Sequence, residues 1–137
     1  VARVLYRKPG EEKTFVITDA GMNDLLRPSL YQSFHGIQPV MQNREGTITA
    51  DVVGPICESG DFLAVDRQIP DVEQGDLLAV MSAGAYAFAM SSNYCSRPKV
   101  AEVMVSGDDF HVTRARQGYK DLVAGESIPP FLATGDG

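Results

Sequence analysis

The chain has 137 residues, of which 44% are hydrophobic and 22% charged, and its formal net charge is −6. This length suffices for one domain with a buried core but not for two, and the composition is that of an ordinary globular protein. The basic residues are scattered along the sequence, which argues against a nucleic-acid-binding surface, because such a surface needs Lys and Arg clustered on one face.

Short apolar runs rich in β-branched residues, separated by turn signals, predict a mostly β chain. The expected strands, in chain order, are 1–7, 14–18, 47–53, 61–68, 77–81, 101–106 and 110–114. Gly107, Asp108 and Asp109 separate the last two strands and indicate a hairpin. An all-β barrel or sandwich with one or two short helices is therefore the expected fold class.

Helical signals are few. Asn23 or Asp24 is expected to cap a short helical turn over 25–31, with Pro28 early in it. Residues 83–90 predict a short helix or a tight loop, and 119–124 one more helical turn. We expect one domain over 1–126, followed by an extended or disordered tail over 127–137.

The chain begins at Val1 inside a strand-like run, without a signal peptide before it or an apolar stretch long enough to span a bilayer. We interpret it as a piece of a longer, cytoplasmic protein. The two cysteines, Cys57 and Cys95, could pair, but one pair is no disulfide scaffold and reduced thiols are expected. His35 and His111 would complete a zinc set, yet no two of the four lie close in sequence, so no metal site is predicted.

Residues 54–61, Gly-Pro-Ile-Cys-Glu-Ser-Gly-Asp, are the first candidate site. Gly and Pro fix tight turns, and a thiol beside a carboxylate can donate a proton or bind a cationic group. The competing interpretation is a half-buried Cys57 in a loop, with Glu58 in water.

Arg27 and Tyr31 lie four residues apart, so on one helical turn they share a face and could clamp a carboxylate. Tyr86 follows two small residues and could approach a ligand closely. The competing interpretations are an Arg packed over Tyr31 and a core Tyr86 at the end of a strand. Residues 91–94, followed by Arg97-Pro98, are interpreted as a loop that supports the site.

Together these segments resemble the diaminopimelate decarboxylase family. The resemblance rests on residues 19–24, Arg27-Pro28, Tyr31, Gly54-Pro55, 57–61, 84–86, 90–94 and Arg97-Pro98, in the family's order and at about its spacings. It covers nearly the whole chain but only the C-terminal portion of such an enzyme. The family is of the alanine-racemase-like class of pyridoxal-phosphate enzymes, with an N-terminal (β/α)8 barrel, absent here, and a C-terminal β-domain.

The resemblance implies decarboxylation of meso-2,6-diaminopimelate to L-lysine in lysine biosynthesis. Cys57 would be the proton donor after carbon dioxide leaves, and Glu58 would bind the distal ammonium of the substrate. Arg27 and Tyr31 would hold a substrate carboxylate, and Tyr86 would contact both the cofactor and the substrate.

The resemblance also implies a homodimer with shared active sites, into which the loop of Cys57 and Glu58 reaches from the partner. The cofactor is expected to be pyridoxal 5'-phosphate, held by a lysine outside this chain, because Lys8, Lys13, Lys99 and Lys120 match no cofactor-lysine motif. Where the family usually has Asn, this chain has Cys95, which removes an amide donor and acceptor. This chain alone is expected to be inactive.

Two other functions remain open from the sequence. One is a related decarboxylase of ornithine or arginine; these substrates lack a distal carboxylate and would not need the clamp of Arg27 and Tyr31. The other is a non-catalytic binding or dimerisation module of the same fold. The resemblance implies that strands from before the (β/α)8 barrel also contribute to the β-domain. Without them the sheet would have an open edge, so we expect the isolated piece to dimerise or aggregate.

Overall fold

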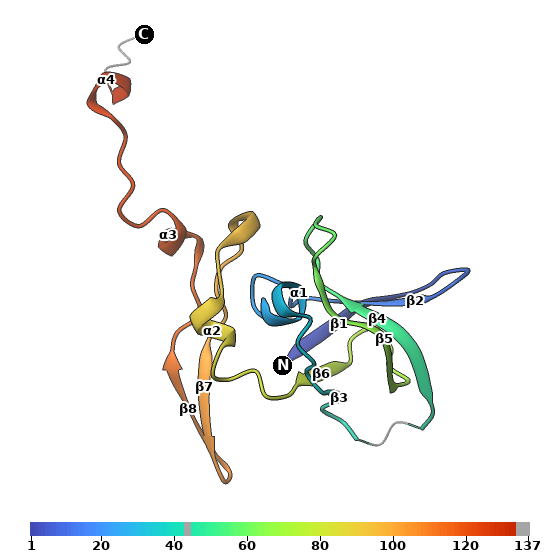
Figure 1. The fold of residues 1–137 in the computed structure, drawn as a ribbon. Helices are drawn as coiled ribbons and strands as arrows, with labels where there is room; N and C mark the ends of the chain where they lie inside the picture. The colour runs from blue at the N-terminus through green and yellow to red at the C-terminus, as the bar shows by residue number, and fades with distance from the viewer. Residues whose placement is uncertain (43–44, 134–137) are drawn as a thin grey trace.

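The computed structural model describes residues 1–42 and 45–133, which form mainly β-strands (Figure 1). The main sheet contains β1 (Ala2–Pro9), β2 (Thr14–Thr18), β3 (Ile37–Pro39), β4 (Thr47–Val53), β5 (Phe62–Pro70) and β6 (Leu77–Val80). A separate hairpin contains β7 (Glu102–Ser106) and β8 (Asp109–Arg114). The helical segments are short: α1 (Arg27–Tyr31), α2 (Ala87–Met90), the 3-10 helix η1 (Tyr94–Ser96), α3 (Tyr119–Leu122) and α4 (Pro130–Ala133).

The main sheet has the strand order β3-β6-β1-β2-β4-β5. Neighbouring strands are antiparallel except β2 and β4, which are parallel, so the chain must cross over between them, and this connection carries α1 and β3. The edge strands β3 and β5 approach each other, and the Arg67 guanidinium on β5 donates a hydrogen bond of 2.8 Å to the His35 carbonyl. The sheet thus nearly closes into a barrel.

The interior of this barrel-like sheet is filled by apolar side chains from alternate strand positions. Val4, Val16, Val52, Leu63 and Leu78 are at most 1% exposed. Each such side chain stabilises the fold by about 1.5–3 kcal/mol relative to an exposed position. The candidate site lies outside this core, on the connections that leave it.

The all-β prediction is confirmed, with some strand ends shifted. The expected strands 14–18 and 47–53 match β2 and β4, and the hairpin signal at Gly107 matches the β7–β8 turn. β5 runs on to Pro70, which a strand at the edge of a sheet tolerates. β3 was not predicted, because three residues ending in Pro39 give too little alternation to recognise.

The predicted helix cap was wrong. α1 begins at Arg27 with Pro28 in its first turn, and its N-cap is Leu26, without a capping side chain. Asp24 instead accepts a hydrogen bond of 3.0 Å from the Gly21 N–H, in the turn that precedes the helix. The polar side chains that suggested a cap therefore organise the approach to the helix rather than its first turn.

The last third of the chain extends away from the main sheet (Figure 1). The β7–β8 hairpin is linked to α2 through Phe88, whose ring lies 4.2 Å from Arg114 Cζ and 5.2 Å from Lys99 Nζ. In the tail, which we expected to be extended or disordered, α4 occupies Pro130–Ala133, and Pro130 fits a first helical turn because it needs no N–H donor there. Residues 134–137 of the tail lie outside the described residues.

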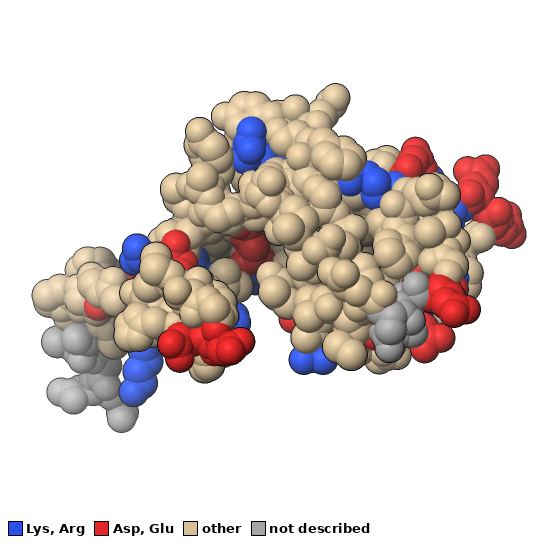
Figure 2. Space-filling view, turned by 90° about the horizontal axis from the view of Figure 1, so that it is seen from below, with Lys and Arg blue, Asp and Glu red and all other residues tan. Residues whose placement is uncertain are grey.

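Charged side chains of both signs occur in small groups on the face shown in Figure 2, without one continuous basic area. Within the described residues, none of the helices has the length and apolarity needed to cross a membrane.

Candidate active site

The loop over 54–61 is fixed from inside by Asp61. This side chain is 4% exposed, and its carboxylate accepts two hydrogen bonds of 2.6 Å from backbone N–H groups, one from Ile56 within the loop and one from Met22. Backbone donors satisfy a buried carboxylate well, and hydrogen bonds to a charged group are stronger than neutral ones. Asp61 therefore joins the loop to the turn over 19–24.

Two glycines make room for this carboxylate. A Cβ on Gly54 would lie 2.5 Å from the Asp61 carboxylate oxygens and 2.5 Å from the Gly21 Cα. A Cβ on Gly21 would lie 2.7 Å from Asp61 Oδ1. Both positions therefore require glycine, because the Asp61 carboxylate lies too close for a side chain. The glycines of two separate sequence motifs thus make room for the same carboxylate.

The loop presents Cys57 and Glu58 to solvent. Cys57 is an exposed free thiol. The Glu58 backbone N–H donates to the Ile56 carbonyl at 2.9 Å, and the Asp61 N–H to the Glu58 carbonyl at 2.9 Å, so the backbone on this side of the thiol is held within the loop. Side chains that point to water from a rigid loop suit chemistry on a ligand that arrives from outside.

The Glu58 carboxylate has two long hydrogen bonds, one to each oxygen. Its Oε2 accepts from Tyr94 Oη at 3.4 Å, and its Oε1 accepts from the Gly60 N–H at 3.5 Å. The negative charge of Glu58 is the main cause that raises the pKa of the Tyr94 phenol above its ordinary value. Glu58 and Tyr94 share the wall of a hollow of about 420 Å³ with Met22, Asn23, Leu26 and Ser92.

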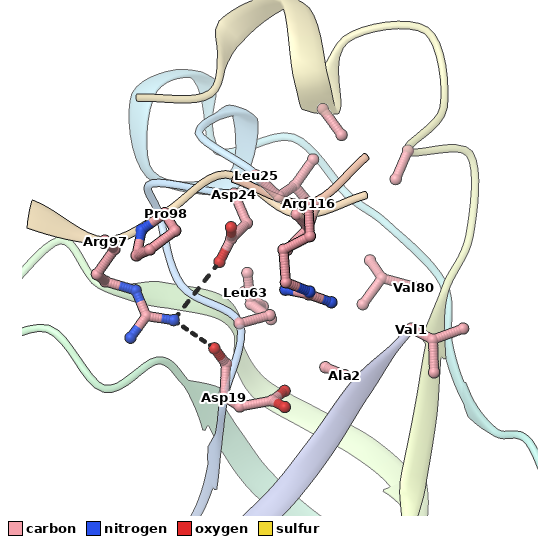
Figure 3. Close-up of a pocket in the computed structure, with 14 residues that line it drawn as sticks. Val1, Ala2, Asp19, Asp24, Leu25, Leu63, Val80, Arg97, Pro98 and Arg116 are labelled. Atoms are coloured by element: carbon pink, nitrogen blue, oxygen red, sulfur yellow. Dashed lines mark hydrogen bonds and ion pairs between the residues drawn. The ribbon is translucent and has the colours of Figure 1, made fainter. Parts of the chain in front are cut away.

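Arg97 ties the Tyr94 segment to the same turn that receives Asp61. Its guanidinium donates to the Asn23 side chain at 3.1 Å. It also donates to the Asp19 carbonyl at 2.5 Å (Figure 3). It also lies 3.9 Å from the Asp24 carboxylate, and the Ser92 N–H donates to the Asn23 carbonyl at 3.0 Å. Two loops far apart in sequence are thereby fixed to one turn.

Behind Arg97 lies a cavity of about 200 Å³ with both polar and apolar lining, which includes Leu25, Leu63 and Val80 and into which Arg116 extends (Figure 3). Asp24 borders this cavity. Burial raises the pKa of the Asp24 carboxyl above its ordinary value, and the Gly21 N–H and Arg97 only partly oppose that rise. The two carboxylates that line this cavity, Asp19 and Asp24, already accept hydrogen bonds from the Arg3 and Gly21 N–H groups, at 2.7 Å and 3.0 Å.

Arg27, Tyr31 and Tyr86 form a second part of the site. Arg27 Cζ lies 4.9 Å from the centre of the Tyr86 ring, a cation–π contact between α1 and the residue before α2. Arg27 thus packs over Tyr86 rather than over Tyr31, which is 61% exposed. Among the described residues no carboxylate pairs with Arg27, so its N–H groups can receive one from a ligand.

The structure does not join the two parts of the site. Cys57, Glu58 and Tyr94 form one cluster and Arg27 and Tyr86 the other, and in the described part of the chain no hydrogen bond, ion pair or ring contact connects them. Two of the lysines have partners elsewhere: Lys13 pairs with two aspartates and Lys99 lies over Phe88. Three or more metal-ligating side chains do not come together anywhere among the residues described.

Sequence reasoning gave Asp61 no role of its own, and placed Tyr94 and Arg97 in a supporting loop. The signal for Asp61 was available: an acidic residue with Gly54 and Gly60 in the same short loop indicates a close backbone approach to a carboxylate. No comparable signal identified the partners of Arg97, since they lie more than seventy positions earlier in the chain.

The fold and this site define a β-barrel-like domain that presents a thiol, a carboxylate and a guanidinium from firmly held segments. The family model described as pyridoxal-dependent decarboxylase, C-terminal sheet domain, matches residues 1–84. The chain belongs to this family.

Relatives extend the match over most of the chain. A diaminopimelate decarboxylase from Pseudomonas aeruginosa is 52% identical over 130 residues, which are 95% of this chain and 31% of the relative. The crystal structure of diaminopimelate decarboxylase from Helicobacter pylori complexed with L-lysine is 44% identical, with a TM-score of 0.82 over 90% of this chain and 30% of that one. The corresponding M. jannaschii enzyme with L-lysine has a TM-score of 0.89 at 34% identity, over 96% and 30%. The chain thus spans about three tenths of these relatives.

Proposed function

We propose that this chain is the C-terminal domain, over 1–126 with a tail over 127–137, of a cytoplasmic enzyme that decarboxylates meso-2,6-diaminopimelate to L-lysine. The observation that carries the proposal is the loop held by Asp61, which presents Cys57 and Glu58 together to solvent. The names of the relatives agree with this substrate.

The substrate has an amino-acid group at each end, and the exposed groups match the end that does not react. The Arg27 guanidinium is a planar donor that fits a carboxylate, and the Tyr31 hydroxyl, one helical turn on, would add a hydrogen bond. The Glu58 carboxylate would bind the ammonium of that end. Cys57 would deliver the proton of its thiol to the carbon that loses carbon dioxide.

Pyridoxal phosphate, when bound, would delocalise the electron pair left on that carbon. Tyr86 could contact this cofactor, because its ring is exposed and packs against Arg27. The engagement of Lys13 and Lys99 elsewhere supports a cofactor lysine outside this chain. The domain would then shape the substrate site while another domain holds most of the cofactor.

A homodimer with shared sites is part of the proposal. The separation of the Cys57 cluster from the Arg27 cluster supports it, because each cluster can then serve a different active site. In such an arrangement, Cys57 and Glu58 of one subunit would act on a substrate held by Arg27 of its partner.

The test is carbon dioxide release by the intact protein, loaded with pyridoxal phosphate and offered meso-diaminopimelate, ornithine or arginine in separate reactions. Release from diaminopimelate alone is the expected result. Release from ornithine or arginine would agree with the family assignment but overturn the assigned carboxylate clamp of Arg27 and Tyr31. No release from any of the three would favour the non-catalytic binding module.

A further inference from the structure

We infer that Tyr94 is a positioning residue for the Glu58 carboxylate, and that this pair selects ligands with an ammonium at their far end. The inference rests on the proposed function, since it assigns a task to one of the same side chains. It goes further by naming a residue that would determine specificity without touching the reacting carbon.

The backbone around Tyr94 is held in an unusual shape. Cys95 and Ser96 follow it with φ angles of 55° and 56°, a left-handed conformation that side chains other than Gly and Asn adopt at a cost. Such a conformation persists where neighbours fix it, and here the Asn93 side chain donates to the Arg97 carbonyl at 2.8 Å. Arg97 itself is anchored to the turn over 19–24, so the direction of Tyr94 is set by the fold.

Tyr94 restrains a side chain that otherwise has only a weak partner. Glu58 is exposed, and besides the phenol its carboxylate meets the Gly60 N–H at 3.5 Å. Fixing a long, exposed side chain costs conformational entropy when a ligand binds, and a partner already in place lowers that cost. The 3.4 Å separation from Tyr94 Oη is long for a hydrogen bond, so the carboxylate keeps capacity for an incoming ammonium.

The charge of the pair supports the same role. A phenol is protonated at neutral pH at its ordinary pKa, and the Glu58 carboxylate raises the pKa of the Tyr94 phenol further, so the hydroxyl remains a donor. A donor hydroxyl leaves the full negative charge on Glu58. The pair therefore favours a cationic group in the hollow that both residues line.

The experiment compares two ligands on the intact protein by titration calorimetry. L-lysine carries an amino group beside its carboxylate, and 6-aminohexanoate is the same molecule without that group. Tyr94→Phe should weaken L-lysine binding by about three- to tenfold, the effect of one hydrogen bond, and change 6-aminohexanoate binding by less than about twofold. Tyr6→Phe, an exposed phenol on β1, is the matched control.

A double-mutant cycle separates positioning from a general structural role. In a Glu58→Gln background, Tyr94→Phe should have no further effect on L-lysine, because its target is already neutral. Equal losses for both ligands, or equal losses with and without Glu58→Gln, would overturn the inference.

A spectroscopic measurement separates failure of this inference from failure of the proposed function. The Tyr94 phenol can be titrated by NMR of ¹³C-labelled tyrosine, without any ligand, and its pKa should fall when Glu58 becomes Gln. If neither ligand binds, the proposed function and the ammonium selection both fail, while the titration still decides whether the pair exists. An unchanged phenol pKa would exclude the pair itself.

Discussion

The Met22 backbone N–H donates a hydrogen bond of 2.6 Å to the Asp61 carboxylate across 39 positions of sequence. This contact connects the turn that leads into α1 with the loop of Cys57 and Glu58. It makes the geometry of the candidate site depend on a buried residue that no ligand would touch.

Replacing Asp61 by Asn should destabilise this connection. The amide keeps one acceptor oxygen but turns the other position into a donor that faces a backbone N–H. Because hydrogen bonds to a charged group contribute about 1.5–3 kcal/mol each, the free energy of unfolding should fall by about 2–4 kcal/mol. Denaturant unfolding of the intact protein measures this, with Asp108→Asn in the exposed β7–β8 turn as control. A loss no larger than that of the control would contradict the assigned anchor.

Gly54→Ala should be poorly tolerated. Its Cβ would lie 2.5 Å from the Gly21 Cα, which is backbone and cannot turn aside, so the loop must shift. We expect a loss of about 1–3 kcal/mol in the free energy of unfolding, as for overpacking. Gly84→Ala is the matched control, since a Cβ there meets nothing within 4 Å. Similar melting temperatures for the two variants would refute this prediction.

If active sites are shared between subunits, two inactive variants should complement each other. Cys57→Ala removes a general acid and should lower the rate by about a hundredfold or more, while Arg27→Ala should weaken substrate binding severely. Dissociated and remixed in equal amounts, the two should regain about one quarter of the normal activity, because half the dimers then hold one intact site. If the Cys57 and Arg27 clusters of one subunit serve the same active site, mixing the two variants should restore no activity.

Cys95→Asn should stabilise the protein. Cys95 has φ 55° and ψ 31°, a left-handed conformation that Asn adopts more readily than other side chains with a Cβ. We expect a gain of up to about 1 kcal/mol in the free energy of unfolding. Cys95→Ala removes the thiol without this preference and should give no gain, so equal stabilisation by both would count against the backbone explanation.

Asp24 should make stability depend on pH. Burial raises its folded-state pKa above the ordinary value of 3.8, so the folded protein binds the proton more tightly. The resulting stabilisation is complete below pH 3.8 and is lost as the pH rises through the folded-state pKa. The unfolding free energy of Asp24→Asn minus that of the original protein should therefore increase from about pH 3 to about pH 7. A difference that decreases over this range would show that the sign is wrong.

The sequence was a good guide to the strands, because alternation and turn residues are local signals, as for β2 and β4. It missed β3, whose pairing with β6 is decided by the rest of the sheet. It identified the loop of Cys57 correctly as tightly turned. It could not reveal that Arg27 lies against Tyr86, because that contact arises only when α1 and α2 are brought together by the fold.

The turn over 19–24 receives Asp61 from one loop and Arg97 from the other. Any ligand that orders the Cys57 loop through this turn must also order the Tyr94 segment. By thermodynamic linkage, ordering of the Tyr94 segment favours ordering of the Cys57 loop by the same free energy. The two loops then act as one cooperative unit, so amide protons of Met22 and Ser92 would gain protection together on ligand binding.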